Sequence, residues 1–224
     1  MSPLEISPDL QQSEPYLLIQ ECYRVLRNGK SNVAWEILRQ SEQFMQWNHY
    51  PKGDVFDPIS HSQYFYHAHP AANDGSPREE HGHFHLFLRK AGIPEHCQPL
   101  TMDTKDAPEG SLYQDLSHLV AIAMDKRGYP IKLFTTNRWV TGETWYPAPA
   151  VTQMLDRFVI DHAYPSWPVN IWLSSMVKLF KAQIIELLLL RDLAIAEWQT
   201  QYPDNNVYED RRLEILSSVE VFLE

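Results

Sequence analysis

The sequence of 224 residues is poor in cysteine, in glycine and in positive charge. Its two cysteines, Cys22 and Cys97, exclude a disulfide framework and offer no pair at the spacing of a zinc finger. The 19 lysine and arginine residues stand against 29 aspartate and glutamate residues, which gives a formal net charge of −10. Binding to nucleic-acid phosphates needs a basic excess, so we expect no nucleic-acid partner. The sequence also contains no glycine-rich phosphate loop, no nucleophile elbow and no CxxC motif.

Long apolar runs and a recognisable export signal are missing as well. Residues 1–9 have neither a basic segment nor an apolar one, which argues against a signal peptide. The most apolar stretch, 184–195, contains Glu186, Arg191 and Asp192 and falls short of the roughly 18 uncharged residues of a membrane span. Together with the scarce cysteine, these features predict a cytoplasmic protein without a membrane partner. They leave its oligomeric state open.

Helices are indicated where apolar residues recur at a spacing of three to four. We expect residues 1–12 to form a loose arm and residues 13–28 to form a helix that ends at Gly29. A second helix over about 32–47 would complete an antiparallel helical hairpin. In the C-terminal third, three helices are predicted, over 151–162, over 169–199 and after Pro203.

Alternation of apolar and polar residues predicts two hairpins between these helical regions. Their strands are expected at 62–69, 81–89, 117–124 and 131–136. A capping-box pattern beginning at Ser76 would instead make 77–91 a helix, but Gly82 and the period-two alternation favour the strand. We therefore predict a single α+β domain over residues 1–224. In it, a central antiparallel sheet of two hairpins is packed by the N-terminal helical hairpin and the long C-terminal helices.

Histidine is the residue whose distribution stands out. Six of the ten histidines lie between positions 61 and 85, where an even distribution would place about one. Residues i and i+2 of a strand share a face, so His67 and His69 point one way, and His81, His83 and His85 share a face of the next strand. If odd residues of one strand lie opposite odd residues of the other, all five imidazoles form one cluster. A helix over 77–91 would still pair His81 with His85.

Such a cluster is suited to a transition-metal ion. Neutral imidazoles bind iron, copper or zinc well and hold magnesium or calcium poorly. We therefore predict a metal site formed by His67, His69, His81, His83 and His85. Two weaker interpretations are a buried, hydrogen-bonded core of histidine and aromatic residues, and a solvated strand face.

Four further residues are predicted to contact a cofactor or ligand. Glu79 and Glu80 directly precede the second group of histidines. Glu79 shares the parity of those histidines and is suited to bind the metal, to orient a ligand or to act as a general base. Arg138 follows the last predicted strand and can hold an anion through its planar fork, with Trp139 beside it. Exposed charges, and a polar turn with stacked tryptophans, are the structural alternatives.

These residues predict a metal-dependent enzyme that acts on a small molecule. A redox metal held by histidines, with or without glutamate, would imply oxidative chemistry, and zinc would imply hydrolysis or hydration. An oxidoreductase with non-haem iron or copper is favoured over a zinc hydrolase. The alternative is a non-enzymatic protein that binds a metal, haem or an apolar ligand. A third interpretation gives the histidines a purely structural role as a buried hydrogen-bond network.

Three segments of the chain have distinctive sequences: SHSQYFYHAH at 60–69, EHGHFHLF at 80–87 and FTTNRWVTGETW at 134–145. With these segments the chain resembles a family of bacterial proteins that is known only as a domain of unknown function. The resemblance covers about residues 16 to 222. It implies no activity, cofactor or catalytic residue, so the functional prediction depends on the histidines alone.

Overall fold

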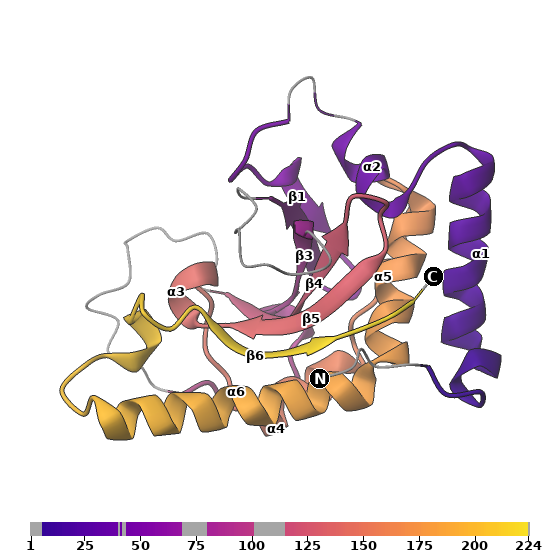
Figure 1. Cartoon of the computed structure of the whole chain (residues 1–224). Helices are drawn as coiled ribbons and strands as arrows, with labels where there is room; N and C mark the ends of the chain where they lie inside the picture. The colour runs from indigo at the N-terminus through magenta and orange to yellow at the C-terminus, as the bar shows by residue number, and fades with distance from the viewer. Residues whose placement is uncertain (1–5, 40, 42–43, 69–79, 101–114, 224) are drawn as a thin grey trace.

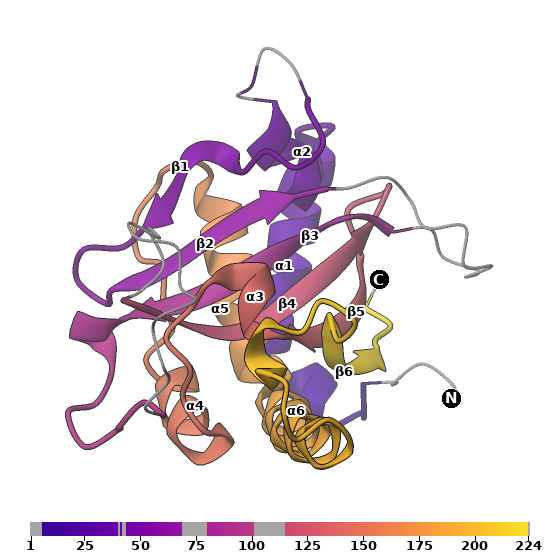
Figure 2. The same cartoon turned by 90° about the vertical axis from the view of Figure 1, so that its left-hand side faces the viewer.

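The computed structural model describes residues 6–39, 41, 44–68, 80–100 and 115–223. At its centre lies a six-stranded antiparallel sheet in which the strands follow one another in chain order (Figure 2). The strands are β1 (Tyr50–Phe56), β2 (Ser62–His67), β3 (Glu80–Arg89), β4 (Leu116–Asp125), β5 (Pro130–Thr136) and β6 (Ile215–Glu220).

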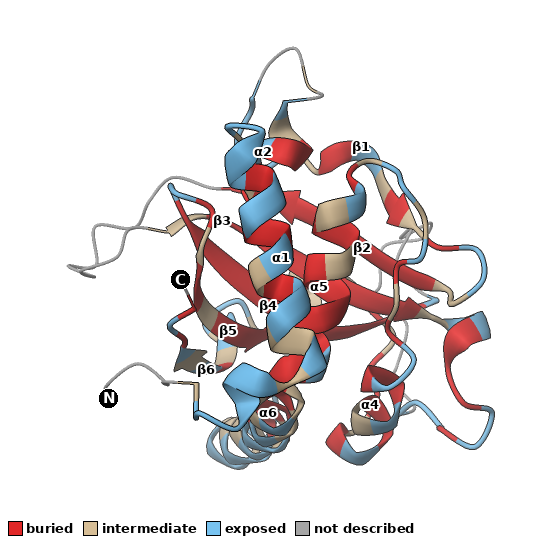
Figure 3. Cartoon of the chain, turned by 90° about the vertical axis from the view of Figure 1, so that its right-hand side faces the viewer, coloured by how far each residue is buried: buried red, intermediate tan, exposed pale blue. Residues whose placement is uncertain are grey.

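The helices are α1 (Glu14–Asn28), α2 (Val33–Leu38), α3 (Arg138–Thr141), α4 (Ala148–Leu155), α5 (Trp167–Leu179) and α6 (Lys181–Gln201). Figure 3 shows α1 and α5 in front of the sheet, with their buried sides turned towards it. Figure 1 shows the long α6 running beneath β5 and β6. No helix in the described part of the chain combines the length and the apolarity needed to cross a membrane.

The sheet face that α1 and α5 cover, which we call the helix face, holds the main core. Alternate side chains of β2, β3 and β4 point into it, namely Tyr64, Tyr66, Phe84, Leu86, Leu88, Val120, Ile122 and Met124. Trp172 of α5 packs against Phe84 with ring centroids 6.1 Å apart. Tyr64 donates a hydrogen bond of 2.7 Å to Asn170 Oδ1. Each fully buried large side chain contributes about 1.5–3 kcal/mol, so this face is the main source of stability.

The β3–β4 ladder is irregular at both of its ends. Near the start of β3, Glu80 pairs with Asp125 and Gly82 with Met124, so that His81 is an extra residue. Further along, Leu86 pairs with Val120 and Phe87 with His118, so that Leu119 is an extra residue in β4. An extra residue of this kind shifts the alternation of side chains on its strand. The two bulges therefore decide which side chains reach the face opposite the helices.

The structure confirms the predicted α+β fold class and its antiparallel sheet. The segment 80–89 is a strand, as the period-two alternation predicted, and the hairpin of β4 and β5 lies where it was expected. The sheet is larger than two hairpins, because residues 50–56, where no strand was predicted, form the edge strand β1. The second predicted helix is short and ends at Leu38.

The C-terminal third departs most from the prediction. The expected helix over 169–199 is two helices, α5 and α6, which meet at Phe180 without a proline or glycine between them. The expected helix over 151–162 is α4, which ends at Leu155. The expected helix after Pro203 is wrong: the segment carries a short 3₁₀ turn and then β6, which pairs with β5. Contacts with distant elements decide the structure here, including a hydrogen bond of 2.8 Å from Ser217 Oγ to the carbonyl of Leu187.

Candidate metal centre

Three imidazoles converge on the sheet face opposite the helices, which we call the histidine face. His67 ends β2 and pairs directly with His83 of β3, and His85 lies two residues further along β3. The ring centroids are 4.4 Å apart for His67 and His83, 4.8 Å for His83 and His85, and 5.3 Å for His67 and His85. One ligand nitrogen from each ring lies within 4.8 Å of the other two. This arrangement brings three nitrogen donors within reach of a single ion.

Apolar side chains surround these imidazoles. Ala121 and Ala123 of β4 lie opposite His85 and His83. They leave room for the ring of Phe134, whose centroid is 5.2 Å from that of His83. His83 and His85 are 4% and 1% exposed. Burial, reinforced by the neighbouring histidines, holds the pKa of His85 well below its usual range, so this ring is neutral and has a nitrogen lone pair to offer.

Glu80 orients the second imidazole. Its Oε1 lies 2.6 Å from His83 Nδ1, and its Oε2 accepts a bond of 3.2 Å from Lys132 Nζ. Burial tends to raise the pKa of Glu80, but the hydrogen bonds and charges of His83 and Lys132 outweigh it and lower the pKa to about 2. An ionised carboxylate only accepts hydrogen bonds, so His83 Nδ1 is the donor. Because Nδ1 faces Glu80, Nε2 is the nitrogen of His83 that can lose its proton and face a metal, as in carboxylate–histidine–metal triads.

A fourth buried histidine, His118, contacts the third imidazole. Its Nε2 lies 3.0 Å from His85 Nδ1. Burial, together with the nearby charge of Arg191, lowers the pKa of His118 to about 3. The backbone N–H of His118 donates to the carboxylate of Glu143, a side chain that is 1% exposed. Burial raises the pKa of Glu143 to about 7, although Arg191 and the bond from His118 act in the opposite direction.

His49 lies on the outer side of the cluster. Its ring stacks on Phe65 with centroids 3.6 Å apart and an interplanar angle of 8°. Its Nδ1 lies 3.1 Å from Asp54 Oδ1, and its centroid is 5.9 Å from that of His67. The His49 side chain is 32% exposed. His49 therefore lies near the cluster with part of its ring in contact with solvent.

The structure brings together three of the five histidines predicted as ligands. His67, His83 and His85 form the cluster, whereas the His81 ring lies with Tyr66 on the helix face, 2.7 Å from the Tyr66 hydroxyl. The bulge at His81 explains this separation, and the same bulge brings Glu80 to His83. His69 and Glu79 lie outside the described residues.

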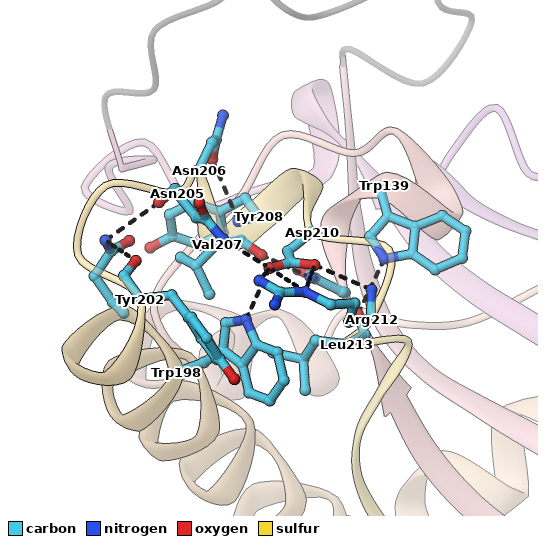
Figure 4. A network of polar contacts seen from close by, with 12 residues as sticks. Trp139, Trp198, Tyr202, Asn205, Asn206, Val207, Tyr208, Asp210, Arg212 and Leu213 are labelled. Carbon is cyan, nitrogen blue, oxygen red and sulfur yellow. Dashed lines mark hydrogen bonds and ion pairs between the residues drawn. The ribbon is translucent and has the colours of Figure 1, made fainter.

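Arg138 and Trp139 contact the C-terminal segment of the chain. Arg138 forms an ion pair with Glu209 and donates to the carbonyl of Glu143. Trp139 Nε1 donates a bond of 3.0 Å to the carbonyl of Leu213, beside the network of Asp210 with its partners (Figure 4). These contacts fasten α3 to the segment before β6, and the structure does not bring the two side chains to the imidazoles.

His118 is the residue of this site that the sequence prediction missed. Strict alternation along β4 would place His118 with Val120, Ile122 and Met124 on the helix face. The extra residue Leu119 reverses this, because it joins the main core itself and turns His118 to the opposite face. A histidine was evident in the predicted strand 117–124. The face on which it lies depends on a bulge that cannot be read from the sequence.

The comparisons with known proteins identify a family and no activity. The profile of a family described as a domain of unknown function (DUF6969) matches residues 16–221. The chain belongs to this family. The predicted resemblance is thereby confirmed. No curated protein and no solved structure gives a significant match to the chain. The function of this DUF6969 protein therefore has to be argued from the geometry of the histidine face.

Proposed function

We propose that this protein binds one transition-metal ion through His67, His83 and His85. With this ion it acts as a metal-dependent enzyme on a small molecule. The observation that carries the proposal is the convergence of three ligand nitrogens to within 4.8 Å of one another. Nδ1 of His83 lies beside the carboxylate of Glu80, and Nδ1 of His85 lies beside His118. Partners of this kind are characteristic of histidines that ligate metals.

The donor set and its surroundings favour iron or copper, with zinc as the second choice. Imidazole nitrogens suit all three ions and are poor ligands for magnesium and calcium. Three protein ligands leave coordination positions for water or substrate, which is typical of catalytic rather than structural sites. The phenyl rings of Phe65, Phe87 and Phe134 beside the imidazoles suit an uncharged reactant. This combination supports oxidative chemistry ahead of hydrolysis.

The test is metal analysis of the full chain, purified without a histidine tag. We expect about one ion per chain after reconstitution with Fe²⁺, Cu²⁺ or Zn²⁺. The double variant His83→Ala, His85→Ala should take up none, and His96→Ala should bind as the wild type does. His96 is a suitable control because it is exposed and contacts Gln153 rather than the cluster. Less than a tenth of an equivalent in the wild type, with no uptake on reconstitution, contradicts the proposal.

A second measurement separates an enzyme from a binding protein. Azide added to the Co²⁺- or Cu²⁺-loaded protein should shift its visible spectrum, because an exchangeable position accepts the anion. An unchanged spectrum would mean that the ion is fully enclosed, and the non-enzymatic alternative would then replace the enzyme. If His67→Ala and His83→Ala lower the free energy of unfolding equally with and without metal, the histidines have a structural role only.

A further inference from the structure

The hydrogen bond between His85 and His118 can have either of two directions. His85 Nδ1 and His118 Nε2 lie 3.0 Å apart, and both rings are buried. One proton lies between these two nitrogens, so one ring donates and the other accepts. Each neutral imidazole carries a single N–H, so the ring that donates has its other nitrogen unprotonated.

The nitrogens that face each other indicate which ring donates. Because Nδ1 of His85 faces His118, Nε2 is the nitrogen of His85 that can bind the ion of the proposed site. A neutral imidazole that offers Nε2 to an ion carries its one proton on Nδ1. His85 Nδ1 is therefore the donor, and Nε2 of His118 is the acceptor.

We propose that His118 is a positioning residue of the metal centre: it accepts the Nδ1–H of His85 and thereby fixes Nε2 of His85 as the donor atom for the ion. This inference rests on the proposed function, and the tautomer of His85 can be measured separately, without metal.

Two features indicate that the fold maintains this contact. The extra residue Leu119 in β4 turns His118 away from the core and towards His85. The carboxylate of Glu143 then accepts the backbone N–H of His118, which holds the strand in place at this point. A buried imidazole is costly unless it is hydrogen-bonded, and the rings of His118 and His85 meet this requirement through each other.

The two ring partners also make the centre asymmetric. His83 donates to an ionised carboxylate, whereas His85 donates to a neutral imidazole. A carboxylate partner makes an imidazole the more basic ligand. We therefore expect His83 to be the stronger donor to the ion and His85 the weaker one, with His118 acting through orientation rather than through charge.

The first readout is the tautomer of His85 in the metal-free, full-length protein labelled with ¹⁵N-histidine. Long-range ¹H–¹⁵N correlation distinguishes protonated Nδ1 from protonated Nε2. We expect His85 to be protonated at Nδ1 in the wild type and in His118→Gln, whose amide oxygen can accept the same proton. In His118→Phe, which lacks an acceptor, the Nε2–H tautomer should become populated. An Nε2–H tautomer in the wild type would overturn the inference.

The second readout is Co²⁺ affinity, measured from the visible absorption of the same proteins. His118→Phe should bind about 10- to 100-fold more weakly, the usual effect of losing a partner of a metal-bound histidine. His118→Gln should retain most of the affinity. Phe87→Leu is the matched control, because it alters packing against His118 without removing a hydrogen-bonding atom.

The outcomes separate this inference from the proposed function. If His118→Phe binds Co²⁺ as tightly as the wild type, the inference is overturned and the metal site stands. If Phe87→Leu weakens binding as much as His118→Phe does, packing rather than orientation is responsible, and the inference is again overturned. If the wild type takes up no metal but has His85 protonated at Nδ1, the proposed function fails and the orienting bond is supported.

Discussion

The two faces of the central sheet are built from alternate residues of the same strands, yet they are filled differently. On β3, Phe84 and Leu86 point to the helix face, while His83 and His85 point to the histidine face. The helix face is apolar and packs against α1 and α5, whereas the histidine face contains buried titratable groups and their hydrogen bonds. One strand thus supplies apolar packing on one side and buried, hydrogen-bonded imidazoles on the other. Substitutions one residue apart should therefore affect different properties.

The largest expected effect comes from emptying the helix face. Phe84→Ala removes a fully buried ring that contacts Trp172. We expect the free energy of unfolding to fall by about 3–5 kcal/mol, from lost burial and the cavity that remains. Urea denaturation measures the loss. The folded variant should still bind one metal ion per chain, and a loss of metal without a loss of stability would contradict the division between the faces.

The histidine face should make stability depend on pH. Burial raises the pKa of Glu143 from its ordinary value of 4.5 to about 7, so the folded chain holds this proton more tightly than the unfolded chain does. Wild-type stability should then fall between about pH 4.5 and pH 7 relative to Glu143→Gln and level off above. The full difference corresponds to about 3 kcal/mol.

Urea denaturation of metal-free wild type and Glu143→Gln across this pH range measures the difference. The variant is well matched, because its amide oxygen can still accept the backbone N–H of His118. Parallel curves for the two proteins would show that Glu143 titrates equally in the folded and unfolded chains. The helix-face variant Phe84→Ala should follow the wild-type pH dependence at a lower level.

A smaller change is expected when the charge of Glu80 is removed. Glu80→Gln keeps an oxygen that can accept from His83 Nδ1 but loses the ionised carboxylate. We expect the affinity for Co²⁺ to fall about 10- to 100-fold, because the ligand becomes less basic. Glu220→Gln is the control, since Glu220 lies opposite the same Lys132 on β6 but is exposed. Equal affinities for wild type and Glu80→Gln would remove Glu80 from the site.

The smallest effect is expected from a single hydroxyl on the helix face. Tyr64→Phe removes the bond to Asn170 Oδ1 and leaves that buried oxygen with one partner fewer. We expect a loss of about 1 kcal/mol in the free energy of unfolding. Metal affinity should stay unchanged, although Tyr64 is adjacent in sequence to Phe65, which contacts His85 and His67. A change in affinity larger than the change in stability would show that the two faces are coupled.

Local sequence signals were sufficient for much of the fold. Alternation located β3, β4 and β5, and the helix α1 ends where Gly29 was expected to end it. The edge strands were not predictable in the same way. The segment of β1 contains Pro51 and Gly53, which are typical of loops, and it pairs only along one side. The strand β6 follows a polar segment and owes its structure to pairing with β5.

The site was predictable as a group of histidines but not as a geometry. Period-two alternation correctly placed His83 and His85 on one face of β3, and His67 lies on the same face of the neighbouring strand, paired with His83. It failed where the strands gain a residue, at His81 and at Leu119. The extra residues place Glu80 instead of His81 beside His83, and they turn His118 towards His85. The hydrogen-bond partners of the imidazoles therefore depend on two bulges. A bulge is set by pairing with a neighbouring strand, and a single sequence does not contain that information directly.

The order of the strands has a consequence for synthesis of the chain on the ribosome. Strands β1 to β5 pair in succession, so each can join the sheet soon after it emerges. The partner of the β5 edge is β6, which follows only after residues 137–214. During that interval the nascent sheet has an open edge whose backbone groups can pair with another chain. Completion of the last strand closes this edge, and until then the growing protein is in the state most exposed to misassembly.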